Sequence, residues 1–151
     1  MKTSSRGIKL IAGYEGFRPI PYLCAGGRIT IGFGHLIMPY EKFTEITIAQ
    51  AQKLLAKDCA IAERAVTRLV TKAINQDIFD ALVSFTFNVG SGNFNRSSVL
   101  RFLNAGDYYH AAMSFRLWTK AGGRPLSGLI KRRAEEALVF TVGAVKLRKI
   151  R

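Results

Sequence analysis

Residues 15–35 read EGFRPIPYLCAGGRITIGFGH, and the fold is decided by this stretch. Glu15 is the only carboxylate among the first forty residues, which also carry five Lys or Arg side chains. Cys24 follows nine residues after Glu15, Thr30 follows six residues after Cys24, and His35 closes the stretch. A single acid accompanied by a thiol and a hydroxyl is suited to proton donation with two assisting groups.

The residues before this stretch predict a helix that ends at Glu15. Ser4 or Ser5 can cap its start, and Gly16 is suited to end it. Glu15 is then placed at the negative end of a helix dipole, which disfavours the charged form of a carboxyl group. The alternative role for Glu15 is a solvated charge at a helix end. The apolar stripe of this helix consists of Ile8, Ile11 and Tyr14, with Leu10 beside them.

The residues after Glu15 predict extended structure and then a β-hairpin from Tyr22 to His35, with its turn at residues 25–27. In the second strand, Thr30 alternates with the isoleucines and shares its face with Gly32 and Gly34. A face without other side chains would let a bulky ligand approach the backbone. The alternative is that the two glycines mark bends in a small sheet.

The rest of the chain predicts helices. Residues 47–50 form a capping box, and a helix of roughly 24 residues, suited to connecting two lobes, would run from there to about Val70. Asn75 caps a helix that ends at Gly90 and has so little polar surface that we expect it at the centre of the second lobe. Further helices are predicted over residues 97–104, 107–118 and 127–141.

Composition and charge narrow the class of protein. The 151 residues are 48% hydrophobic and have a formal net charge of +13, which indicates a folded protein with polyanionic partners. No nucleic-acid partner is expected, because a recognition helix and an aromatic–basic sheet are both missing from the sequence. The two cysteines, Cys24 and Cys59, are expected to be free thiols, with a disulfide between them as the alternative. No metal-binding spacing is present, so neither a metal nor a cofactor is expected.

The two ends of the chain predict where the protein acts. Residues 8–14 are too short and too interrupted for an export signal, and no run is long enough to span a bilayer. We therefore expect the protein to stay in the cytoplasm until another component releases it. Residues 142–151 are basic, and Val142, Val145 and Leu147 alternate with cations as in an amphipathic helix that could lie on anionic lipid. A frayed, solvated end is the alternative.

The spacing of Glu15, Cys24 and Thr30, followed by Ile-Gly-Phe-Gly-His, resembles the Glu–Asp/Cys–Thr triad of phage-type lysozymes (glycoside hydrolase family 24, endolysins). Later segments also resemble this family. They are residues 81–90 (ALVSFTFNVG), residues 100–107 (LRFLNAGD), Trp118 with residues 121–123, and residues 128–133 (GLIKRR) with Glu136. The resemblance extends from about Gly7 to Phe140.

The resemblance implies a mechanism for the site residues. Glu15 takes the place of the general acid, Cys24 falls where many members have Asp, and Thr30 falls where a hydroxyl holds the attacking water. His35 resembles a structural histidine behind the hairpin. Cys24 could act as a weak base, as a dipole that positions water, or as a tolerated replacement. The positions that resemble those lining the sugar cleft are Leu36, Phe87 and Ser97, and either Arg132 or Arg133 resembles the arginine that approaches the catalytic Glu.

The resemblance also implies the fold and the reaction. The expected fold is α+β and mostly helical: a two-lobed lysozyme-like domain with a small antiparallel hairpin sheet and a cleft between the lobes. The expected boundaries are about 14–60 for the β-containing lobe, 47–70 for the connecting helix, 72–141 for the helical lobe packed with the N-terminal helix, and 142–151 for the basic tail.

The expected activity is hydrolysis of the β-1,4 bond between N-acetylmuramic acid and N-acetylglucosamine in peptidoglycan by a monomeric endolysin. A holin would release the enzyme from the host cytoplasm, and its basic tail would contact the anionic outer membrane or lipopolysaccharide. The alternatives are a lytic transglycosylase that cleaves the same bond, and a basic module that binds cell wall or nucleic acid without catalysis.

Overall fold

The computed structural model describes residues 1–150, which divide into two compact units. The first, called here the β unit, is Ile8–Ala60, and the second, called the helical unit, joins Met1–Gly7 to the chain from Ile61 onward. Helix α1 (Ser5–Glu15) begins in the helical unit and ends in the β unit. It ends as predicted, because Gly16 has a positive φ of 67°, a conformation that favours glycine after a helix.

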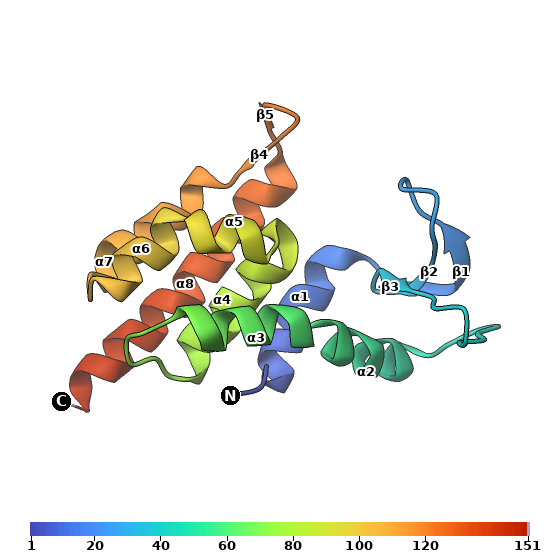
Figure 1. Cartoon of the computed structure of the whole chain (residues 1–151), viewed down its shortest axis with the longest axis horizontal. Coiled ribbons are helices and arrows are strands. Elements are labelled where there is room, and N and C mark those ends of the chain that lie inside the picture. Colours follow the sequence, from blue (N-terminus) through green and yellow to red (C-terminus); the bar gives the residue numbers. More distant parts are fainter. Residues whose placement is uncertain (151) are drawn as a thin grey trace. The chain divides into compact units, whose positions relative to one another are not determined.

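The β unit contains a three-stranded antiparallel sheet in the order β1-β2-β3 (Figure 1). Its strands are β1 (Arg18–Leu23), β2 (Ile29–Gly32) and β3 (His35–Leu36). The predicted second strand is therefore split in two, because Gly32 and Gly34 have positive φ values of 67° and 82° and turn the chain back on itself. This observation confirms the alternative that these glycines mark bends.

Gly32 also has a packing role that the sequence did not reveal. A Cβ atom at this position would lie 3.0 Å from the Cβ of Ala51 and 3.2 Å from the Cδ1 of Ile46. Both residues are buried, and Ala51 belongs to helix α2 (Ile48–Asp58). The expectation that Gly32 clears a face for a ligand is therefore wrong, because Gly32 makes room for a helix.

The helix predicted from residue 47 to residue 70 consists of two helices, α2 and α3 (Ala60–Leu69). Its start is confirmed, since Thr47 and Gln50 form both hydrogen bonds of the capping box. The break falls at Cys59, the C-cap residue of α2, whose backbone N–H donates to the Leu55 carbonyl at 2.9 Å. The division between the two units falls one residue later, after Ala60.

The helical unit is built around α4 (Gln76–Val89), which is capped by Asn75 and ended by Gly90 as predicted. Its buried residues run continuously from Ile78 to Thr86. The long helix α8 (Ser127–Lys149) packs along α4, and the two run side by side in Figure 1. The remaining elements are α5 (Ser91–Arg96), which was not predicted, α6 (Ser98–Asn104), α7 (Tyr108–Ser114), the 3₁₀ turn η1 (Phe115–Leu117), β4 (Lys120–Ala121) and β5 (Arg124–Pro125).

The predicted basic tail is the last part of α8, which continues to Lys149, so the alternative of a frayed end is wrong for residues 142–149. Gly143 is buried in this part, and Leu147 is half-buried, whereas Val142 and Val145 are exposed. The expected apolar stripe is therefore wrong at Leu147, because positions 140, 143 and 147 lie on the same side of a helix and Phe140 faces the core. Residue 151 of the predicted tail lies outside the described residues.

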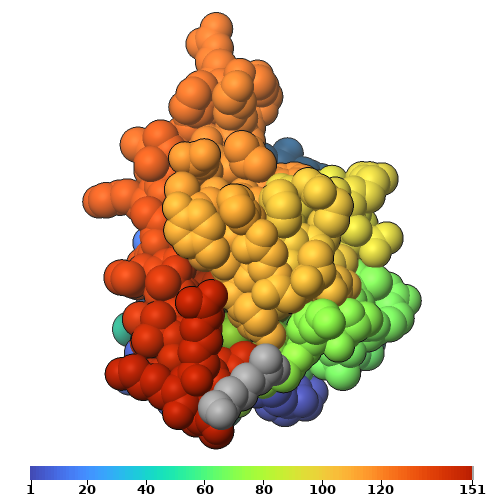
Figure 2. Space-filling model, turned by 90° about the vertical axis from the view of Figure 1, so that its left-hand side faces the viewer, coloured from blue at the N-terminus to red at the C-terminus, as the bar shows by residue number. Residues whose placement is uncertain are grey.

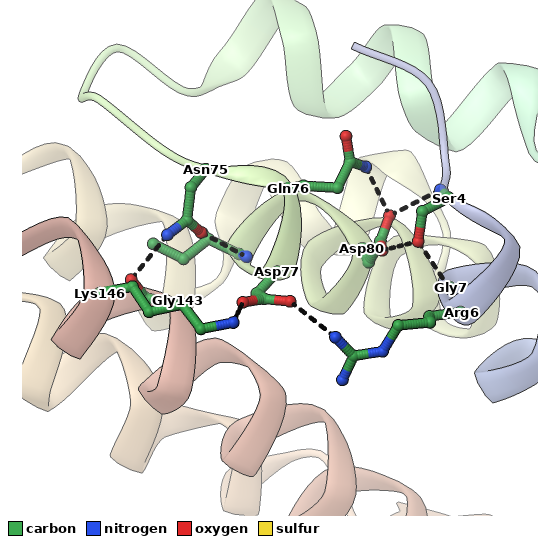
Figure 3. A network of polar contacts seen from close by, with 10 residues as sticks. Ser4, Arg6, Gly7, Asn75, Gln76, Asp77, Asp80, Gly143 and Lys146 are labelled. Carbon is green, nitrogen blue, oxygen red and sulfur yellow. Dashed lines mark hydrogen bonds and ion pairs between the residues drawn. The ribbon is translucent and has the colours of Figure 1, made fainter.

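A polar network holds the N-terminal segment and α8 against the start of α4 (Figure 3). The backbone N–H of Ser4 donates to the Asp80 carboxylate at 3.0 Å, and its hydroxyl donates to the same group. Asp77 pairs with Lys146 at 2.6 Å and with Arg6 at 3.5 Å. Because these contacts join segments that are far apart in sequence, they fix the first turn of α1 to the helical unit.

The close packing of α8 on α4 predicts a large effect of one added methyl group. In Gly143→Ala, the new Cβ would lie 2.7 Å from Asn75 Oδ1 and 2.8 Å from Ile78 Cγ1. We expect a loss of about 1–3 kcal/mol in the free energy of unfolding, since overpacking forces neighbouring groups to shift. Chemical denaturation measures it.

Gly128→Ala is the matched control, because it lies in the same helix and no atom lies within 4 Å of its added Cβ. This variant should be neutral or slightly stabilising. Equal effects of the two substitutions would contradict the packing argument.

Candidate active site

Cys24 and Thr30 lie together on the sheet of the β unit. Cys24 directly follows β1, and Thr30 lies in β2 opposite Tyr22. The Thr30 hydroxyl is within hydrogen-bond reach of the Tyr22 carbonyl oxygen, at 3.3 Å, and of the Cys24 sulfur. Thr30 is buried and Cys24 is half-buried. The Thr30 hydroxyl donates its proton to the Tyr22 carbonyl oxygen, and its oxygen retains lone pairs that can accept a hydrogen bond from water.

The turn that follows β1 changes the acidity of the Cys24 thiol. The backbone N–H of Arg28 is the largest influence and that of Gly26 the next, and both lower the pKa of Cys24. Burial raises the pKa of the thiol by less than these contributions lower it, and the Thr30 hydroxyl lowers it further. The thiolate is therefore more accessible near neutral pH than that of an ordinary cysteine. This is the chemistry of a weak base, and the backbone N–H groups of Arg28 and Gly26 favour it.

Glu15 is the last residue of α1 and is half-buried. Gly16 and Phe17 connect it to β1, and the Phe17 ring packs against the Phe33 ring with 5.5 Å between their centroids. This contact anchors the connection to the sheet immediately after the acid. The three predicted catalytic residues therefore belong to one unit, with Glu15 before β1 and Cys24 after it.

Strand β1, which lies between Glu15 and Cys24 in the chain, contains a bulge. Arg18 pairs with Gly32 and Tyr22 with Thr30, so four steps along β1 correspond to two steps along β2. The extra residues are accommodated at Pro19, Ile20 and Pro21, where a strand with prolines tolerates the loss of ladder hydrogen bonds. Such a bulge bends a strand and increases its twist.

His35 anchors β3 from behind the hairpin, as expected. Its Nδ1 lies 2.9 Å from Asp58 Oδ2, and its Nε2 lies 2.9 Å from Glu41 Oε2, so the buried ring bridges two carboxylates. Burial lowers the pKa of His35, but the hydrogen bonds to Glu41 and Asp58 together outweigh burial and raise it above its ordinary value. Glu41 and Asp58 were not singled out from the sequence, because only the folded chain brings residues 35, 41 and 58 together.

The three predicted substrate-binding residues have different surroundings. Leu36 pairs with Thr30 in the sheet and lines a groove of about 500 Å³ in the β unit. Phe87 is half-buried on α4 in the helical unit. Ser97 is only 2% exposed, and its hydroxyl caps α6 by accepting from the Leu100 N–H while donating to the Phe94 carbonyl. A direct hydrogen bond from Ser97 to a sugar would therefore compete with this cap.

Arg132 and Arg133 both pair with Glu136 inside the helical unit. The distances are 3.1 Å from Arg132 Nε and 2.9 Å from Arg133 Nε to the carboxylate oxygens, and all three side chains are buried. Which arginine approaches Glu15 stays a prediction.

Three further features concern the cysteines, membrane-spanning helices and metal-binding groups. Neither Cys24 nor Cys59 forms a disulfide within residues 1–150, so the alternative of a disulfide between them is wrong. Among residues 1–150, no helix combines the length and the hydropathy needed to cross a bilayer. Within the same residues, no group of three or more histidine, cysteine or acidic side chains is arranged to hold a metal ion.

The profile of the phage lysozyme family matches residues 12–136. The chain belongs to the phage lysozyme family. An endolysin of Bacillus phage B103 is 38% identical over 148 residues, which are 97% of this chain and 56% of that endolysin. The chain thus spans little more than half the length of that relative.

Two solved structures have the same fold as this chain. A P22 lysozyme mutant is 37% identical with a TM-score of 0.87 and covers 93% of this chain and 99% of its own. The muramidase domain of SpmX from Asticaccaulis excentricus is 38% identical with a TM-score of 0.83 and covers 92% of this chain and 97% of its own. The expected mostly helical, lysozyme-like fold is therefore confirmed.

The raised pKa of His35 predicts how the stability of the protein depends on pH. A group whose pKa is higher in the folded than in the unfolded state contributes stability below its unfolded value, about 6.5 for histidine, and loses it as the pH rises through the folded value. The midpoint temperature of thermal unfolding should therefore decrease as the pH is raised from 6 to 9. The midpoint temperature of the His35→Gln variant should decrease less over this pH range.

His110→Gln serves as the control, because His110 is an exposed histidine that contacts Asp107 on the surface. This variant should keep the pH dependence of the wild-type protein. If His35→Gln has the same slope as the wild-type protein, the His35 cluster does not contribute as described.

Proposed function

We propose that the protein is an endolysin that hydrolyses the β-1,4 bond between N-acetylmuramic acid and N-acetylglucosamine in bacterial peptidoglycan. The observation that carries this proposal is the contact of Cys24 with Thr30 on the sheet that follows Glu15, in a chain of the phage lysozyme family. Cleavage of a glycosidic bond needs an acid for the leaving oxygen and a group that manages the incoming water. Glu15 takes the first task and the Cys24–Thr30 pair the second.

In this mechanism, Glu15 protonates the glycosidic oxygen as the bond to the anomeric carbon breaks. A water held by the Thr30 hydroxyl attacks that carbon and passes its proton to the Cys24 thiolate. Attack on the face opposite the leaving group gives inversion at the anomeric centre. Leu36, at the groove of the β unit, contributes an apolar contact to the sugars. Phe87 and Ser97 of the helical unit stay predicted substrate-binding residues, and the Ser97 hydroxyl caps α6.

The role of Glu15 is tested by two variants. Glu15→Gln cannot donate the proton, and we expect a loss of activity of at least about 100-fold. Cys24→Ser should retain measurable activity, because Thr30 still holds the water. Release of reducing sugar ends from purified peptidoglycan measures both variants.

Glu45→Gln removes an exposed carboxylate of the same unit and should leave the rate unchanged. A fully active Glu15→Gln protein would overturn the mechanism. Mass spectrometry of the products separates hydrolysis from the alternative reaction, since an anhydro-sugar product would assign a lytic transglycosylase.

We also propose that α8 attracts the enzyme to anionic envelope surfaces. Leu138, Val142 and Val145 are exposed by 63%, 41% and 49% and lie on the side of α8 opposite the buried Glu136 and Phe140. In Figure 2, the C-terminal part of α8 lies at the surface beside α7. Exposed cations flank this apolar face at Lys131, Arg148 and Lys149. Such a pattern favours binding to anionic lipid.

Truncation of residues 142–151 would also remove the contacts of Gly143 and Lys146 with α4, so point changes give a cleaner test. Val142→Ser with Val145→Ser should weaken binding to anionic vesicles and leave hydrolysis of purified peptidoglycan unchanged. Co-sedimentation with vesicles measures binding. Unchanged binding of the double variant would sink the proposal for α8.

A further inference from the structure

One cation lies at the groove that Leu36 lines. The Arg28 side chain is exposed and forms no ion pair within the described part of the chain, residues 1–150. The single acid of the groove, Glu41, is occupied, because its carboxylate accepts hydrogen bonds from the His35 ring and from the backbone N–H of Met38 at 2.9 Å each. The other lining residues are all apolar: Ile29, Leu36, Ile37, Met38 and Pro39.

Arg28 connects this groove to the candidate catalytic thiol. Its backbone carbonyl accepts a hydrogen bond from the Cys24 N–H at 2.9 Å, and its own N–H lies against the Cys24 sulfur. Thr30 lies two residues after Arg28 and pairs with Leu36 across the sheet. A ligand group bound by the Arg28 guanidinium is therefore held within one side-chain length of the Cys24–Thr30 pair.

The chemistry of the groove fits a sugar strand with an acidic substituent. Ile29 and Met38 are 55% and 40% exposed, so they offer apolar surface to the C–H faces of pyranose rings. A guanidinium binds a carboxylate through two parallel hydrogen bonds, which a primary amide cannot reproduce with the same charge. The groove thus combines an apolar wall with a single cationic group that forms no ion pair with residues 1–150.

We infer that Arg28 selects peptidoglycan whose stem peptides carry free carboxylates over peptidoglycan in which these groups are amides. This inference rests on the proposed function and names the part of the substrate that the groove binds. The Arg28 guanidinium pairs with a stem-peptide carboxylate while the sugars lie against Ile29, Leu36 and Met38. Arg28 is a specificity residue, because its charge distinguishes two forms of one polymer.

The test compares two forms of the same solubilised glycan–peptide fragment, one with free carboxylates and one in which they have been converted to amides. Binding is measured calorimetrically with the Glu15→Gln protein, so that the fragment stays intact. We expect this protein to bind the acidic form about tenfold more tightly than the amide form. Adding Arg28→Gln should abolish the preference, and adding Arg28→Lys should restore part of it.

Lys9→Gln is the matched control, because it removes one exposed cation of the same unit away from the groove. It should keep the tenfold preference, whereas a general effect of net charge would reduce the preference in both variants. Circular dichroism checks that Arg28→Gln is folded. Equal binding of the two forms by the Glu15→Gln protein, no binding of either, or a full preference in Arg28→Gln overturns the inference.

These results are separable from the proposed function. The proposed function fails if the wild-type protein releases no reducing ends from peptidoglycan. The inference about Arg28 fails on the binding ratio alone, even when the wild-type protein is fully lytic.

Discussion

The burial of one carboxylate, Glu136, constrains the whole helical unit. Its side chain has no exposure to solvent, and Ser84 of α4 donates to it at 2.6 Å while Arg132 and Arg133 pair with it from its own helix. Burial raises the pKa of Glu136, and Arg133 and then Ser84 and Arg132 act in the opposite direction. Removing one partner of such a cluster leaves a buried charge without compensation, which typically costs about 3–5 kcal/mol. The cluster therefore fixes the rotation of α8 against α4.

This rotation decides which parts of α8 are available to partners. With Glu136 turned inward, Phe140 and Gly143 also face the core, and Gly143 is small enough to let α8 approach Asn75 and Ile78 closely. Leu138, Val142 and Val145 are consequently exposed. A surface that could bind lipid is thus a geometric consequence of a charge cluster on the opposite side of the same helix.

A second charge cluster plays the corresponding role in the β unit. His35 connects the short strand β3 to Asp58 at the end of α2 and to Glu41 in the loop between β3 and α2. Since β3 pairs with β2, and β2 pairs with β1, the strand that carries Thr30 is supported on both edges. The assisting groups of the candidate site therefore lie on a sheet held by buried polar contacts, and such support preserves the geometry that catalysis requires.

The sequence by itself determined the features that depend on neighbouring residues. These are the end of α1 at Glu15, the caps at Thr47 and Asn75, the hairpin that brings Cys24 to Thr30, and the family that the spacing indicates. Only the tertiary structure decided the break at Cys59, the packing role of Gly32, the inward direction of Leu147, the partners of His35 and the position of Arg28 at the groove. The physical reason is that caps and turns are satisfied within a few residues of the chain, whereas space and charge are satisfied by whichever distant segment packs against them.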